Sequence, residues 1–176
     1  ADPAPAPDPL PPPRAHPLAL AGEVIVPLAG RSLTWMDRQG SLQVEQVEAR
    51  AHALPWELRR RDQVSRLEGG ALWIRFVAAA PPGEHWYVEL GAVAYDRVQL
   101  HYRDAQGAWV VQEAGTGQPV DSWAVPGRVP TFALANDDPR PVDYWLRVED
   151  DRADFSAPLT LLREDALQQS REKEQF

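Results

Sequence analysis

The segment Leu72-Trp73-Ile74-Arg75-Phe76 carries a clear structural signal. Its first, third and fifth residues are apolar, and a tryptophan and an arginine stand between them. Successive side chains of a β-strand point to opposite faces of the sheet, so this period of two predicts a strand with one face toward a core. The intervening tryptophan and arginine belong to the opposite face.

Segments with a similar pattern follow along the chain, separated by stretches that contain glycine, proline and aspartate. They are Trp86–Leu90, Val98–Tyr102, Trp109–Val111, Thr131–Leu134, Tyr144–Val148 and Pro158–Leu162. Many short strands joined by turn-forming residues are typical of an antiparallel sandwich. The sequence therefore predicts an all-β fold.

Two segments have helical rather than strand spacing. Residues 42–49 place Leu42, Val44 and Val47 on one side of a short helix. Residues 164–174 are polar nearly all round, which is typical of a solvent-exposed connector rather than of a core helix.

The prolines concentrate at the N-terminus, where eight of the 18 lie within the first 17 residues. Proline has no backbone N–H and cannot donate to a sheet, so we expect residues 1–19 to form a proline-rich disordered segment. A folded domain over residues 20–163 and a polar connector over residues 164–176 complete the expected organisation. The sequence contains no apolar stretch of membrane-spanning length and no signal-peptide pattern.

The chain has 176 residues, a net charge of −8 and no cysteine. The acidic balance argues against nucleic acid as a partner, because phosphate binding requires a basic surface. It also argues against docking on an anionic membrane surface. Without cysteine the chain has no disulfides, thiol catalysis or cysteine-ligated metal sites.

The alternation also predicts which side chains face outward. The outward positions combine flat aromatic rings with planar polar groups, a pairing that suits a sugar or another small polar ligand. The candidate ligand-binding residues are Trp73, Arg75, Tyr87, Glu89, Gln99, Trp145 and Arg147. The alternative is that the outer tryptophans fill a second, smaller core beneath a covering segment.

Catalysis and metal binding have little support. Hydrolase, metalloprotease and nucleotide-binding motifs are absent, and the four histidines show no ligand spacing. The acidic run at residues 149–154 lacks the spacing and glycine of a calcium loop, so we expect a turn. Asp37 and Asp96 are also expected to fix turns. We predict no catalytic residues, no metal and no cofactor.

Four pieces of the chain, in order, resemble one family. They are Leu33-Thr34-Trp35-Met36-Asp37 with Gly40-Ser41-Leu42, Leu72–Phe76, Val88–Leu100, and Tyr144–Val148 followed by Pro158–Leu161. Together they are similar to the second extracellular type of sensor domain in bacterial seven-transmembrane receptors with diverse intracellular signalling modules. The resemblance runs from about residue 33 to residue 167 and does not include the proline-rich segment.

This resemblance implies a jelly-roll sandwich similar to carbohydrate-binding modules, located in the periplasm ahead of seven membrane helices. It implies a histidine kinase, often a hybrid sensor kinase, or a cyclic-di-GMP enzyme as the cytoplasmic output. The expected partners are a small ligand such as a carbohydrate, the receptor's own transmembrane helices and a second copy in a homodimer.

Two alternatives to a ligand-sensing input domain stay open at this point. One is a carbohydrate-binding module of a secreted hydrolase, which would share the fold and differ in the segment that comes after residue 176. The other is a protein-interaction or dimerisation domain without a small ligand, in which the outer aromatic residues meet a partner.

Overall fold

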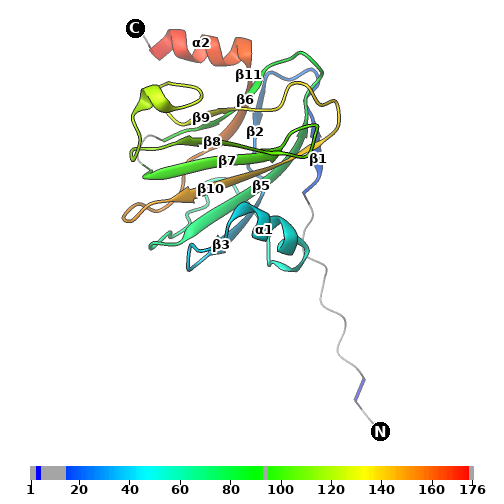
Figure 1. The fold of residues 1–176 in the computed structure, drawn as a ribbon, viewed down its shortest axis with the longest axis vertical. Coiled ribbons are helices and arrows are strands. Elements are labelled where there is room, and N and C mark those ends of the chain that lie inside the picture. Colours follow the sequence, from blue (N-terminus) through cyan, green and yellow to red (C-terminus); the bar gives the residue numbers. More distant parts are fainter. Residues whose placement is uncertain (1–2, 5–14, 93–94, 175–176) are drawn as a thin grey trace.

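The computed structural model describes residues 3–4, 15–92 and 95–174 and forms a two-sheet β-sandwich with two α-helices (Figure 1). Its elements in chain order are β1 Pro17–Ala19, β2 Ile25–Pro27, β3 Leu33–Asp37, α1 Val44–Arg50, the 3₁₀ turn η1 Ala51–Ala53, β4 Glu57–Leu58, β5 Ala71–Ala79, β6 Trp86–Leu90, β7 Arg97–Arg103, β8 Trp109–Ala114, the 3₁₀ turn η2 Val120–Ser122, β9 Thr131–Ala133, β10 Val142–Glu149, β11 Leu159–Arg163 and α2 Glu164–Glu174. The predicted all-β jelly-roll sandwich is confirmed.

The larger sheet has the strand order β4-β3-β5-β10-β7-β8, with β1 also paired to β5. The smaller sheet has the order β2-β11-β6-β9. Among the strands of the described residues, the pairings are antiparallel except that of β1 with β5, which is parallel. The β5–β10 pairing places Leu146 opposite Ile74 and Tyr144 opposite Phe76, so the apolar sets of the two central strands share one face.

The main core lies between the sheets. The side chains predicted to face inward from β5, β6, β7 and β10 all belong to it, with Tyr102 packed at its margin. Phe76 and Tyr144 stack there with their ring centroids 5.0 Å apart. The period-two assignment of faces is therefore confirmed for these four strands.

The predicted helix at residues 42–49 is α1, which begins at Val44. Gln43 precedes it as the N-cap, and its backbone N–H donates to the Gln46 side chain at 2.8 Å. The predicted helix at residues 164–174 is α2, which lies across the smaller sheet beside β11 and β6 (Figure 1). Ala166 and Leu167 of α2 are buried against Leu162, so this connector also packs on the domain.

The N-terminal boundary differs from the prediction. Residues 17–19, which were expected to be disordered, form β1 and pair with Val77–Ala79 of β5. Leu20 follows as a buried core residue, and its backbone N–H donates to the backbone carbonyl of Ala79 at 3.0 Å. Burial of Leu20 ties the preceding residues to the sheet despite their proline content. Most of the remaining proline-rich segment, residues 1–2 and 5–14, lies outside the described residues, as do residues 175–176 of the predicted connector.

Within the described part of the chain, no helix combines the length and the apolar character that a membrane crossing requires.

Candidate functional site

The seven predicted ligand-binding residues do not share one surface. Tyr87 and Glu89 belong to β6 of the smaller sheet. The other five lie on β5, β7 and β10 of the larger sheet, on the face away from the main core; they are Trp73, Arg75, Gln99, Trp145 and Arg147. The seven residues therefore do not form one site, because period two assigns a face within each strand but not the sheet to which that strand belongs.

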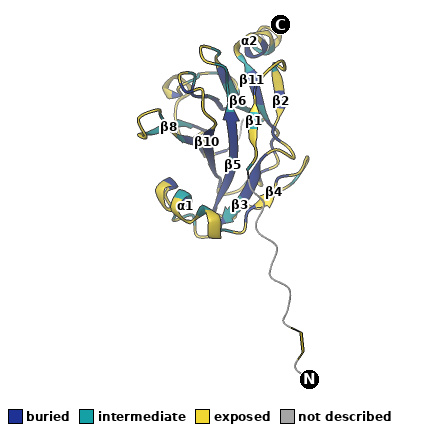
Figure 2. Ribbon diagram, turned by 90° about the vertical axis from the view of Figure 1, so that its right-hand side faces the viewer, coloured by how far each residue is buried: buried dark blue, intermediate teal, exposed yellow. Residues whose placement is uncertain are grey.

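The two tryptophans of this set are covered. Trp73 is 0% exposed and Trp145 is 2% exposed, in a second hydrophobic cluster with Val44 and Val47 of α1 and with Trp56. In Figure 2, β5 and β10 are coloured as buried along much of their length. The Trp56 ring lies 6.1 Å from that of Trp145. The structure therefore has the alternative arrangement, in which Trp73 and Trp145 fill a covered second core.

The polar members of the set on the larger sheet have partners within the chain. Arg75 forms an ion pair with Asp143 at 2.9 Å, and its guanidinium lies 4.6 Å from the ring centroid of Trp145. Arg147 pairs with Glu149 and donates to the backbone carbonyl of Gly40 at 2.9 Å. Gln99 donates to Glu113. These side chains are therefore engaged by other groups of the domain.

On the smaller sheet, Tyr87 packs against α2. It borders the small cluster formed by Leu162, Ala166 and Leu167. Burial raises the pKa of Tyr87, and the nearby carboxylate of Glu164 adds to this effect, so the phenol is neutral at physiological pH. Tyr87 therefore helps to seat the helix.

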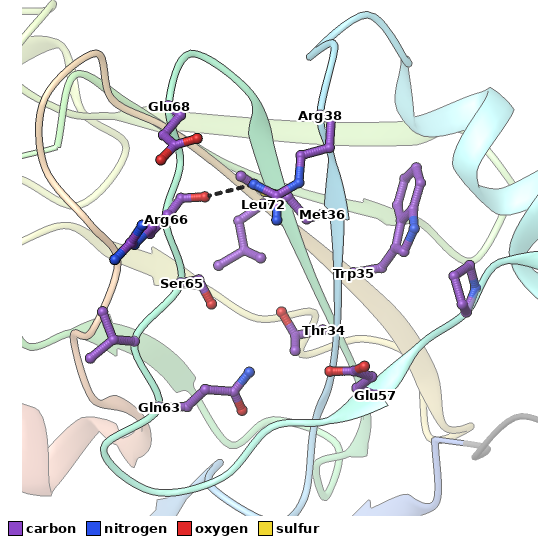
Figure 3. Close-up of a pocket in the computed structure, with 12 residues that line it drawn as sticks. Thr34, Trp35, Met36, Arg38, Glu57, Gln63, Ser65, Arg66, Glu68 and Leu72 are labelled. Carbon is purple, nitrogen blue, oxygen red and sulfur yellow. Dashed lines mark hydrogen bonds between the residues drawn. The ribbon is translucent and has the colours of Figure 1, made fainter.

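A groove of about 770 Å³ lies beside β3, near the β4 edge of the larger sheet (Figure 3). The strand β4 pairs with Leu33 and Thr34, the first two residues of β3. Beyond that point the chain turns away and returns as residues 63–68, here called the 63–68 loop. The groove lies between β3 and this loop, and its volume is in the range of small-molecule sites.

The groove combines apolar surface with polar side chains of both charges. Trp35 borders it at the edge of β3, but the Trp35 ring is on the opposite face of the sheet, where Trp35 pairs with Trp73 and its ring centroid lies 6.2 Å from that of Trp56. Met36 and the buried Leu72 add apolar surface. The remaining lining groups are polar or charged and come mainly from the 63–68 loop; they include Arg38, Glu57, Gln63, Ser65, Arg66 and Glu68.

Thr34 is the most informative residue of the groove. It is 5% exposed, and within the described part of the chain its hydroxyl oxygen has no hydrogen-bond partner. A buried polar group without a partner costs about 1–3 kcal/mol, so most such groups in folded proteins are paired. Figure 3 shows Thr34 near the middle of the groove, between Ser65 and Glu57.

The middle of the 63–68 loop is attached to two other segments of the domain. Ser65 and Phe155 exchange two backbone hydrogen bonds, of 2.8 and 2.7 Å. Arg38 of the loop after β3 donates to the backbone carbonyl of Arg66 at 3.3 Å (Figure 3). A Cβ on Gly70 would lie 2.7 Å from the Asp37 carbonyl oxygen, so only glycine allows this close approach. Glu68 has φ of 47°, a strained value of the kind that is often found near ligand sites.

A second cavity, of about 500 Å³, borders Trp145 on the outer face of the larger sheet. Its charged groups include two ion pairs, since Arg103 binds Glu48 at 2.8 Å and Arg140 binds Asp138 at 3.1 Å. With Trp145 buried, this cavity offers a ligand little aromatic surface.

The aspartates that were expected to fix turns do so. A carboxylate oxygen of Asp37 accepts the Leu42 N–H at 2.9 Å, and one of Asp96 accepts the Asp151 N–H at 3.1 Å. The acidic run forms a turn around Asp150. Burial opposes ionisation of Asp150, but the N–H groups of Ala153, Arg152 and Asp96 outweigh this and lower its pKa. Among residues 3–4, 15–92 and 95–174, no cluster of three acidic or histidine side chains is placed to hold a metal ion.

The sequence patterns did not single out Thr34 as a site residue, although it lies in the segment that carried the resemblance. Neither the open edge of β3 nor the missing partner of Thr34 leaves a signal in the sequence, because both result from where residues 57–68 run. The apolar stripe of residues 42–47 was a usable signal for the covered tryptophans.

Comparison with known proteins identifies the family. A family model described as 7TMR-DISM extracellular 2 matches residues 31–163. The search of curated proteins gives no match. Among solved structures, the chain is similar to one described as TmCBM61 in complex with beta-1,4-galactotriose, with a TM-score of 0.40, 14% sequence identity, and coverage of 76% of this chain and 88% of that chain. Since the family match spans well over half of the chain, this protein belongs to the 7TMR-DISM extracellular 2 family, the extracytoplasmic sensor domains of seven-transmembrane receptors.

Proposed function

We propose that this domain is the ligand-sensing input of its receptor and that the groove beside β3 binds a small polar ligand of carbohydrate type. The observation that carries this proposal is the buried Thr34 hydroxyl, unpartnered among the described residues, which borders the groove. A bound ligand hydroxyl would supply the missing hydrogen bond. Met36, on the same face of β3 as Thr34, would contact an apolar patch of C–H groups on the ligand.

The charges of the groove favour a neutral ligand. Arg38 and Arg66 are balanced by Glu57 and Glu68. A neutral polyol or sugar can bond to both charge types, whereas a charged ligand would meet repulsion from one of them.

The 63–68 loop offers a route from binding to signalling. It lines the groove and is joined to the segment before β11 through Ser65 and Phe155. The strand β11 leads directly into α2. We propose that ligand binding changes the position of this loop, and that α2 connects the domain to the membrane helices and to a histidine kinase or cyclic-di-GMP output. A ligand acts only through its different affinity for two states, so the free and bound loops must differ. The family is a sensor family, and we assign this domain no catalytic role.

Calorimetric titration of the purified domain with glucose, galactose and short β-1,4-linked oligosaccharides tests the proposal. We expect saturable binding that is weakened in Met36→Ala and largely retained in Met36→Leu. Trp35→Ala is the matched control, because Trp35 is also half-buried and precedes Met36 in β3, but its ring lies on the opposite face of the sheet beside Trp56. No binding to the wild type, or equal loss in both alanine variants, would contradict the site. Circular dichroism checks that each variant is folded.

A further inference from the structure

Arg59 is a buried cation without a carboxylate partner among the described residues. It is 5% exposed, and its Nη1 atom is buried without a hydrogen-bond partner. None of the ion pairs within the described ranges includes it. A guanidinium taken out of water loses several kcal/mol of hydration, so buried arginines are normally paired with acids.

The aromatic contact of Arg59 does not offset this cost. Its guanidinium lies 4.7 Å from the ring centroid of Phe155. A desolvated cation–π contact is worth about 2 kcal/mol, which is less than the loss of hydration, and it provides no acceptor for the buried N–H group. Burial also lowers the pKa of Arg59, which is the direction expected for a cation that lacks an anionic partner.

Arg59 lines a cavity of about 850 Å³. Residues 27–30, 59–62 and 156–160 bound this cavity, which shares no lining residue with the groove beside β3, here called the Thr34 groove. Arg60 and Arg61 line it as well, and Asp62 is the single acidic residue among the described residues that line it. The cavity thus has a cationic lining in a chain with a net charge of −8.

We propose that this cavity binds a small oxyanion, a carboxylate, sulfate or phosphate group of a soluble molecule, with Arg59 as its main ligand. A guanidinium has donors that match two oxygens of such a group, and a water-poor setting strengthens the charge-assisted bonds. Arg60 and Arg61 would attract the anion from solution without being essential to its affinity. This site is separate from the Thr34 groove and does not depend on sugar binding there.

Thermal unfolding and calorimetric titration test the proposal with sodium sulfate, sodium phosphate and sodium glucuronate, each against sodium chloride of equal ionic strength. Because glucose is also a test ligand for the Thr34 groove, only the part of glucuronate binding that is lost in Arg59→Met is assigned to this cavity. We expect at least one oxyanion to bind saturably and raise the melting temperature of the wild type, as any ligand that binds only the folded state must. The glucuronate and inorganic arms distinguish an organic acid from a free inorganic anion.

Arg59→Met should weaken this binding by about 10- to 100-fold, the effect of losing one charged hydrogen-bond partner. Arg128→Gln removes an equal charge from an exposed position outside the cavity and should leave binding unchanged. If Arg59→Met does not fold, Arg59→Lys keeps the charge but loses the two-oxygen geometry, and it should also bind more weakly. Equal effects of chloride and oxyanions, or equal loss in Arg128→Gln, would overturn the proposal. So would absence of binding to the wild type, and none of these results bears on sugar binding in the Thr34 groove.

Discussion

Replacing Thr34 with valine should stabilise the free domain while weakening its ligand binding. Valine has nearly the shape of threonine, so the substitution removes the hydroxyl with little change in packing. Within the described residues, this hydroxyl is buried without a partner in the free domain. The two effects therefore have opposite signs, which is uncommon for a core substitution.

The size of the effect is set by the burial of the group. An unpaired buried hydroxyl costs about 1–3 kcal/mol, and we expect Thr34→Val to recover about 1 kcal/mol of this. For a domain of this size, that gain raises the melting temperature by about 2–4 °C. Loss of one neutral hydrogen bond to the ligand should weaken affinity by about 3- to 10-fold.

Thr131→Val is the matched control. Thr131 is also buried, but its hydroxyl donates to the Val129 carbonyl at 3.1 Å. The control should lose about 1 kcal/mol of stability and keep its ligand affinity. Urea unfolding gives the stabilities, and calorimetric titration gives the affinities. A Thr34→Val domain that is no more stable than the wild type would refute the reasoning, since the hydroxyl would then have a partner in the free state.

Two further predictions concern the cluster beneath α1. Trp145→Ala should destabilise the domain by about 3–5 kcal/mol in urea unfolding, because it leaves a cavity in a packed core; Val111→Ala, at a position 51% exposed, should change stability by less than about 0.5 kcal/mol. A stable Trp145→Ala domain that had lost ligand binding would instead identify Trp145 as a binding residue. His101 is buried, and desolvation is the main cause that lowers its pKa below the ordinary value of about 6.5. The unfolded chain then binds the proton more readily, so the stability from neutral His101 is present above about pH 6.5 and is lost as the pH falls toward the folded pKa. Unfolding at about pH 7.5 and about pH 5.5 should show a smaller difference in His101→Gln than in the wild type, and an unchanged difference would contradict this assignment.

The inward faces of the strands could be predicted from the sequence because they depend on local spacing. Trp86–Leu90 was predicted with its structural bounds, and the alternate positions that begin at Leu72 of β5, Val98 of β7 and Tyr144 of β10 face the main core. The pairing of β1 could not be predicted from composition, since proline argues against strands and only the burial of Leu20 outweighs it.

The candidate site was much less predictable. Trp73 and Trp145 lie on the outer face, as expected, but their exposure depends on whether another segment covers them. Residues 42–56 do so, through α1 and Trp56. A period of two identifies a face of a strand, and it contains no information about the segment that packs on that face.

The sequence by itself determined the all-β class, the inward faces, the two helices and the family resemblance, because each rests on local patterns or on their order along the chain. Only the tertiary structure decided where a ligand can bind. The Thr34 groove lies between β3 and the 63–68 loop, and three separate segments of the chain line the Arg59 cavity. Whether a buried hydroxyl or guanidinium finds a partner depends on these long-range approaches, which the local sequence does not specify.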